Sequence, residues 1–195
     1  MHSDRDVTKN VYHHGDLRAT LLRSAAQQIA AEGVEAVSLR ALAQRAGVSH
    51  AAPAHHFGNR QGLLTDLAIE GFDLLAAELH SAAADFREVA VAYLRFVRRY
   101  PGHFGIMFRC DLLRADDAAL DAARGRARAE LDSGVEQLCI PVHDRPAVGL
   151  AAWSLVHGLS GLWREGALAG SDADSSDPEE MARRIFAVIA FVGEM

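Results

Sequence analysis

The spacing of apolar residues along the chain predicts helices from one end to the other. One such repeat, at every fourth position, follows a capping residue at Asp16 and stops at Gly33: Leu17, Leu21, Ala25 and Ile29. Further helical repeats continue towards the C-terminus, without the alternation of apolar and polar positions that marks a half-buried strand. The expected fold class is therefore all-α, with about nine helices.

The stretch from Ser38 to Arg60 contains the sharpest turn in this pattern. The Ser38 hydroxyl can cap a short amphipathic helix, Gly47 can end it in a left-handed conformation, and Ser49 can cap a second helix. That second helix carries only small or imidazole side chains before Phe57: His50, Ala51, Ala52, Ala54, His55 and His56. Such a thin surface suits the floor of a DNA major groove, so we expect a helix-turn-helix, although structural hairpins share this pattern.

This stretch resembles the TetR family of one-component transcriptional regulators. The residues that carry the resemblance are Ser38-Leu39-Arg40, Ala46-Gly47-Val48-Ser49 and His56-Phe57-Gly58-Asn59-Arg60 followed by Leu63-Leu64. The resemblance covers residues 12 to about 67. Two positions depart from the family pattern: Pro53 replaces a branched apolar residue, and Ala54 replaces a tyrosine that touches phosphate. We therefore expect ordinary geometry with somewhat lower DNA affinity.

The predicted DNA-binding residues fall into two groups. Three residues at helix starts are expected to contact phosphates and position the protein: Ser38, Arg40 and Arg60. Four residues of the second helix are expected to face base edges: His50, Ala51, Ala52 and His55. Ser49 and His56, which flank the second group, complete the predicted set.

The chain is expected to divide into an arm and two domains. Residues 1–11 are polar and aperiodic and predict a disordered arm, and residues 12–60 form the DNA-binding domain. Residues 61–195 form a ligand-binding and dimerisation domain, in which residues 61–84 are a connecting helix that leaves the first domain. The resemblance implies that this helix relays the state of the ligand domain to the DNA-reading heads.

Aromatic and polarisable residues of the second domain predict an apolar ligand pocket: Tyr93, Phe96, Phe104, Met107, Phe108, Trp153 and His157. The alternative, that they only fill a helical core, is at least as good for each residue. Trp153 and His157 lie on one helix face, and with Gly158 they resemble a TetR subgroup with a tryptophan followed by His-Gly. The resemblance also implies a homodimer, formed through residues 146–168 and 177–195.

Composition and charge narrow the function class. The net charge is −6, but residues 1–60 carry +2 and residues 61–195 carry −8, so the basic end is the helix-turn-helix end. Cys110 and Cys139 show no disulfide pattern, which favours a reducing cytoplasm, and Cys110 is expected to be a buried, inert thiol. The absence of a long apolar run or a signal peptide predicts a soluble protein with no membrane partner.

No cofactor or metal is expected. Adjacent histidines on a helix, as at His13-His14 and His55-His56, point about 100° apart and chelate one ion poorly. The chain also has no glycine-rich phosphate loop, nucleophile motif or usefully spaced pair of acids, which argues against an enzyme.

These patterns and the resemblance together predict a ligand-responsive DNA-binding transcriptional regulator. We expect a repressor that leaves a palindromic double-stranded DNA operator when a small hydrophobic molecule binds. The alternative is a helical small-molecule-binding protein or enzyme whose N-terminal hairpin is structural. An activator that recruits a protein partner is a third interpretation.

Overall fold

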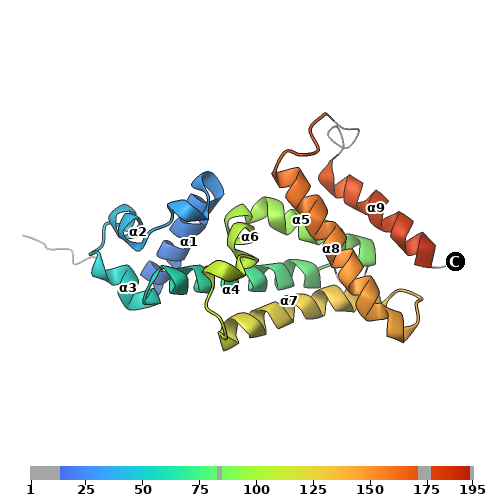
Figure 1. Ribbon diagram of the computed structural model, residues 1–195, viewed down its shortest axis with the longest axis horizontal. Helices are drawn as coiled ribbons and strands as arrows, with labels where there is room; N and C mark the ends of the chain where they lie inside the picture. The colour runs from blue at the N-terminus through green and yellow to red at the C-terminus, as the bar shows by residue number, and fades with distance from the viewer. Residues whose placement is uncertain (1–13, 83–84, 171–176, 194–195) are drawn as a thin grey trace, which may run out of the picture.

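The computed structural model describes residues 14–82, 85–170 and 177–193. These ranges contain nine α-helices, three short 3₁₀ helices and no strand, which confirms the all-α prediction (Figure 1). The expected arm, residues 1–11, lies outside them. In the described part of the chain, no helix has both the length and the apolar character needed to cross a membrane.

The first three helices form a small head at one end of the molecule: α1 (His14–Glu32), α2 (Leu39–Ala46) and α3 (Ala51–Phe57), with the 3₁₀ helix η1 (Val34–Ala36) after α1 (Figure 1). As predicted, the Ser38 hydroxyl accepts a hydrogen bond from the Ala41 amide at 3.2 Å, and Gly47 ends α2 with a φ of 67°. The predicted side-chain cap at Ser49 is wrong. His50 already has helical backbone angles, and the Ser49 carbonyl rather than its hydroxyl accepts the Ala52 amide at 3.0 Å.

The long helix α4 (Arg60–His80) leaves the head and runs through the rest of the molecule (Figure 1). Its 21 residues span roughly 30 Å at about 1.5 Å per residue. It ends at His80, four residues before the expected end of the connecting helix. The remaining elements pack around it: α5 (Phe86–Arg99), α6 (Pro101–Met107), η2 (Cys110–Leu112), α7 (Ala118–Glu136), η3 (Val142–Asp144), α8 (Arg145–Arg164) and α9 (Pro178–Gly193).

The helix α7 lies alongside α4 and points the same way, joined to it by an ion pair between Arg126 and Asp73 at 2.6 Å (Figure 1). On the other side of α4, α6 reaches the head. Tyr100 separates α5 from α6, and Pro101 starts α6 at its first position, where its missing N–H costs nothing. A Cβ at Gly102 would lie 2.0 Å from the Ala26 carbonyl oxygen of α1, so glycine allows α6 and α1 to touch backbones.

Candidate nucleic-acid interface and ligand cavity

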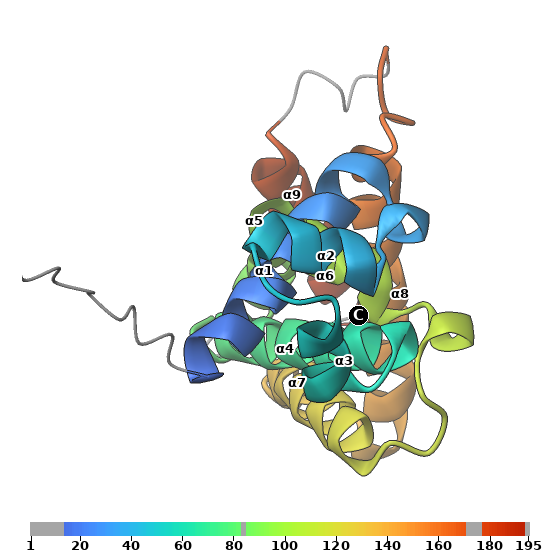
Figure 2. The ribbon, with the colours of Figure 1, turned by 90° about the vertical axis from the view of Figure 1, so that its left-hand side faces the viewer.

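The helix α3 lies at the outer end of the head (Figure 2). Buried Pro53 and Phe57 fix its inner face against the protein. The outer side chains of α3 and that of His50, the residue just before it, are small or imidazole, and four of them are exposed: His50, Ala51, Ala54 and His55. Ala52 and His56 are half-buried. The residues predicted to face bases therefore lie on one short surface helix.

The two arginines predicted to contact phosphate lie in different environments. Arg40, in the first turn of α2, is exposed. Arg60 donates from Nε to the Val37 carbonyl at 2.9 Å and from Nη2 to the Val34 carbonyl at 2.7 Å. The Arg60 side chain thus attaches the start of α4 to the loop between α1 and α2, and these donors are not free for phosphate.

The joint between head and body lies at Gly62, where three segments meet. The Asn59 side chain caps α4 by accepting the Gly62 amide at 2.9 Å. From the loop after η2, the Arg114 guanidinium donates to the carbonyl of Phe57, the last residue of α3, at 3.0 Å. A Cβ at Gly62 would lie 2.0 Å from the Phe57 oxygen and 2.3 Å from the Arg114 nitrogen. The end of α3 is therefore held by a residue of the C-terminal domain.

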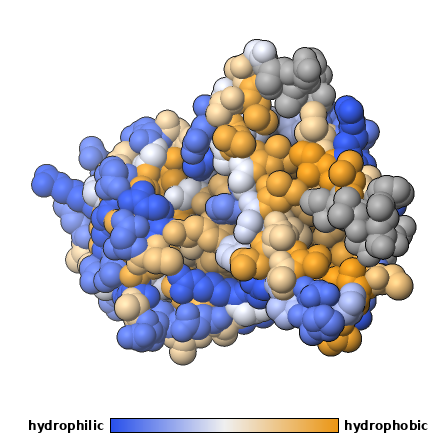
Figure 3. Space-filling model, turned by 45° about the vertical axis from the view of Figure 1, so that its right-hand side comes forward, coloured by the Kyte–Doolittle hydropathy of each residue, from blue (hydrophilic) through white to orange (hydrophobic). Residues whose placement is uncertain are grey.

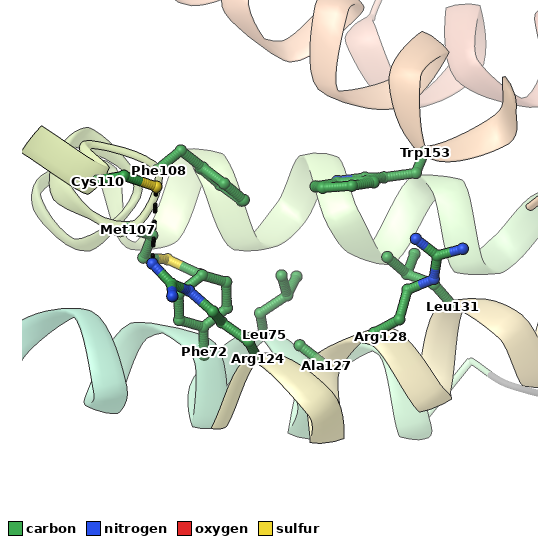
Figure 4. A pocket seen from close by; sticks show the side chains of 10 residues that line it. All are labelled: Phe72, Leu75, Met107, Phe108, Cys110, Arg124, Ala127, Arg128, Leu131 and Trp153. Atoms are coloured by element: carbon green, nitrogen blue, oxygen red, sulfur yellow. Dashed lines mark hydrogen bonds between the residues drawn. The ribbon is translucent and has the colours of Figure 1, made fainter. Parts of the chain in front are cut away.

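A cavity of about 280 Å³ opens in the C-terminal domain between α4, α6, α7 and α8. The residues that line it are mostly apolar: Phe72, Leu75, Met107, Phe108, Cys110, Arg124, Ala127, Arg128, Leu131 and Trp153 (Figure 4). The rings of Phe108 and Trp153 lie over the cavity from the same side, with centroids 6.2 Å apart. The cavity has the character of a site for a small apolar molecule.

The predicted ligand residues divide into three groups in the structure. Met107, Phe108 and Trp153 line the cavity. Tyr93, Phe104 and His157 form a ring cluster next to it, in which the His157 ring lies 4.6 Å from that of Phe108. Phe96 is fully buried and packs on Tyr100, outside the cavity lining.

Sequence reasoning missed the part of the cavity that α4 and α7 provide. Phe72 and Leu75 lie in the predicted connecting helix, and neither they nor any residue of α7 is among the predicted ligand residues. The sequence of α7 does indicate one apolar face, because its apolar positions recur three or four residues apart: Leu120, Ala123, Ala127 and Leu131. The last two of these line the cavity.

The Tyr93 hydroxyl and His157 form a polar pair beside the cavity, with 2.9 Å between the Tyr93 oxygen and Nδ1 of His157. Burial raises the pKa of Tyr93, so its hydroxyl keeps the proton and donates it in this bond. Burial, and to a smaller extent the positive charge of Arg164, lowers the pKa of His157 below its ordinary value. The imidazole is therefore neutral at pH 7 and accepts the hydrogen bond.

Both cysteines are exposed free thiols, so the prediction of a buried Cys110 is wrong. Cys110 begins η2 at the edge of the cavity rather than in the core. No group of three His, Cys, Asp or Glu side chains able to hold a metal ion occurs in the described part of the chain. The predicted pair His13-His14 falls outside the side chains that the structure describes.

The outer faces of α8 and α9 expose large apolar side chains. Leu150 is 52% exposed, Leu162 is 47% exposed and Val188 is 65% exposed. Hydrophobic residues gather on the side of the molecule that these helices form, whereas the head is mostly hydrophilic (Figure 3). Gly158, on α8, has open space where a Cβ would stand. This surface has the apolar character of a protein interface.

Two family models match the sequence. Residues 21–67 match the model for bacterial regulatory proteins of the tetR family, and residues 86–189 match the tetracyclin repressor-like C-terminal domain. Among curated proteins, no sequence shows significant similarity to the chain.

Solved structures share the fold over nearly the whole chain. A protein of unknown function from Rhodococcus sp. RHA1 is 30% identical, with a TM-score of 0.78, and the match covers 95% of this chain and 98% of that one. The TetR family transcriptional regulator PfmR from Thermus thermophilus is 26% identical, with a TM-score of 0.64 and coverages of 88% and 97%. A regulatory protein of the tetR family from Rhodococcus RHA1 is 20% identical, with a TM-score of 0.70 and coverages of 91% and 96%, a likeness of fold alone.

Proposed function

Because the chain belongs to the TetR family of DNA-binding transcription regulators, we propose that it is a dimeric repressor that leaves a palindromic operator when a small apolar molecule fills the cavity beside α4. It is a ligand-responsive regulator and not an enzyme, so the alternative of an enzyme with a structural hairpin is set aside. A protein that binds an operator acts where the bacterial DNA lies, so the proposed location of this regulator is the cytoplasm.

The observation that carries the DNA-binding part of the proposal is the exposed face of α3. Its alanine methyls suit thymine methyls, and its exposed imidazoles, His50 and His55, suit the acceptor atoms of purines in the major groove. Arg40 and Ser38, at the start of α2, supply the phosphate contacts that position this helix. Arg60 has a supporting role, because it fixes the loop that leads into α2.

The release part of the proposal rests on the chain path between the cavity and the head. Met107, Phe108 and Cys110 line the cavity, and the same segment continues within a few residues to Arg114, which holds the end of α3. The backbone amide of Arg114 also donates to the buried Thr65 hydroxyl of α4 at 3.0 Å. A ligand that moves the end of α6 therefore pulls on both α3 and α4.

The dimer part of the proposal rests on the apolar faces of α8 and α9. One head offers few phosphate contacts, whereas two heads related by a two-fold axis read two half-sites of a palindrome. Covering exposed leucines such as Leu150 and Leu162 supplies the free energy of association.

In vitro selection from random DNA duplexes tests the function. We expect enrichment of one palindrome whose half-sites are spaced by about one helical turn or a multiple of it. Selected sites without two-fold symmetry, or no enrichment, would contradict the proposal. On the selected duplex, Arg40→Ala should lower the slope of log affinity against log salt by about 1 for each subunit. Arg126→Ala, far from the head, is the control and should leave the slope unchanged.

A further inference from the structure

The charged groups that line the cavity are all of one sign. Its described lining contains two arginines, Arg124 and Arg128, and no aspartate or glutamate. The two residues lie four positions apart on α7, so both rise from the helix face that the cavity covers (Figure 4). A cationic molecule would meet two like charges there, whereas an anion would meet two opposite ones.

The guanidinium of Arg124 donates hydrogen bonds only to weak or solvent-exposed acceptors, so a stronger acceptor could replace them. Its Nη2 donates to the Cys110 thiol, at 3.7 Å, and sulfur is a weak acceptor (Figure 4). Its Nη1 reaches Asp121 at 3.3 Å, and that carboxylate is 65% exposed, so solvent weakens the pair. A carboxylate, sulfonate or phosphate at the cavity mouth would replace the thiol as the partner of this guanidinium.

Arg128 is held in a different way. Its Nε donates to both carboxylate oxygens of Asp132, at 2.9 and 3.0 Å, and its guanidinium lies 5.8 Å from the centre of the Trp153 ring. This geometry makes Arg128 part of the cavity wall at the end opposite Cys110 (Figure 4). Its charge adds positive potential at that end of the cavity, and the close ion pair with Asp132 offsets part of this potential.

We propose that the cavity binds an apolar organic anion, with its head group on Arg124 and its body against Phe72, Phe108 and Trp153. The proposal rests on the proposed function, because it names the ligand class of the same cavity. An anion buried in an apolar site needs a paired cation, and Arg124 supplies one at the mouth while the body displaces water from the apolar walls. The volume of about 280 Å³ lies at the small end of the range for ligand pockets, so it suits a compact molecule of two or three rings rather than a long-chain amphiphile.

Two fluorescent dyes with the same ring body test the charge requirement. The first is 8-anilinonaphthalene-1-sulfonate, and the second is N-phenyl-1-naphthylamine, which lacks the sulfonate. On the full chain we expect the anionic dye to bind more tightly than the neutral one. Arg124→Gln should weaken the anionic dye about tenfold and the neutral dye less than about twofold. Arg126→Gln, whose side chain faces Asp73 outside the cavity, should change neither affinity.

The substitution Ala127→Leu tests whether the dyes bind in the cavity. Because Ala127 lines it, the larger side chain narrows the space and should weaken both dyes. Three results would overturn the proposal. In Arg124→Gln, the two dyes would lose affinity equally, or the anionic dye would lose none. In Ala127→Leu, both dyes would bind as they do to the wild type. Operator binding by the same samples separates this inference from the proposed function, since Arg124→Gln leaves the head intact and should still shift the selected duplex.

Discussion

At the scale of single residues, the joint at Gly62 shows how strongly one missing side chain can shape the molecule. The Phe57 carbonyl and the Arg114 guanidinium occupy the space that any Cβ would need. The neighbouring contacts add to this joint, because Gln61 donates to the Leu113 carbonyl at 3.0 Å. The end of α3, the start of α4 and the loop after η2 therefore share one tightly packed point.

Gly62→Ala should destabilise the protein by about 1–3 kcal/mol, since the backbone oxygen of Phe57 has to move to admit a methyl group. Urea unfolding followed by circular dichroism measures the change. The control is Gly125→Ala in the middle of α7, where a Cβ meets nothing within 4 Å. That substitution should stabilise the protein by about 0.5–1 kcal/mol through helix propensity. Equal effects of the two substitutions would argue against a packed joint.

The pKa of His157 gives the stability a pH dependence. Burial lowers this pKa in the folded protein, and the unfolded chain keeps the ordinary value near 6.5. As the pH falls through about 6.5, the unfolded state binds the proton first, so stability is lost until the pH passes below the folded pKa. The fall in Tm between about pH 7.5 and about pH 5.5 should therefore be smaller in His157→Gln than in the wild type. An equal fall in both proteins would mean that this imidazole does not contribute.

At the scale of elements, α4 carries the connection between the two domains. It begins at Arg60 in the head and supplies Phe72 and Leu75 to the cavity wall. The segment from α6 through η2 forms a second connection between the domains. It extends from Met107 at the cavity to Arg114, which binds the last carbonyl of α3. Under the proposed function, the two connections carry the same signal, because both reach the head at Gly62.

Arg114→Ala should loosen α3 without disturbing the C-terminal bundle. It removes a charged hydrogen bond from the last carbonyl of α3, so amide exchange in α3 should speed up about tenfold while exchange in α8 stays the same. Hydrogen exchange with mass spectrometry measures both helices in one sample. Uniform acceleration over the whole chain would indicate global destabilisation, and an unchanged α3 would remove Arg114 from the proposed connection.

The elements were predictable where their signals are local, and the site was predictable only in part. The cap at Ser38 and the left-handed turn at Gly47 depend on residues no more than four positions apart, so the sequence pattern predicts them directly. The carbonyl groups that Arg60 binds lie 23 and 26 positions away in the sequence, and no local pattern predicts these hydrogen bonds. Likewise, spacing shows which residues of α7 are apolar, but only packing decides that Ala127 borders a void.

At the scale of the whole molecule, hydrophilic and apolar side chains lie on different parts of the surface. The head presents a hydrophilic end with α3 outermost, and α8 and α9 present apolar side chains (Figures 2 and 3). The exposed apolar side chains of α8 and α9 lie within the two segments predicted to form a dimer, residues 146–168 and 177–195, and the dimer itself stays a prediction. Under the proposed function, a two-fold axis through this face would join two copies away from their heads.

Leu162→Glu should prevent association, because it places one charge from each subunit in the proposed apolar interface. Light scattering after gel filtration should then give a monomer, and operator affinity should fall about a hundredfold or more, since the two half-sites are no longer bound together. Ala129→Glu, an exposed position on α7, is the matched control and should remain a dimer. A wild-type protein that is monomeric at all concentrations would exclude the proposed assembly.

The position of Phe72 and Leu75 on the helix that begins in the head has a thermodynamic consequence. If filling the cavity weakens operator binding by some factor, linkage requires the operator to weaken ligand binding by the same factor. DNA then acts as an effector in its own right, and adding saturating operator duplex should drive a bound dye out of a site that no nucleotide touches.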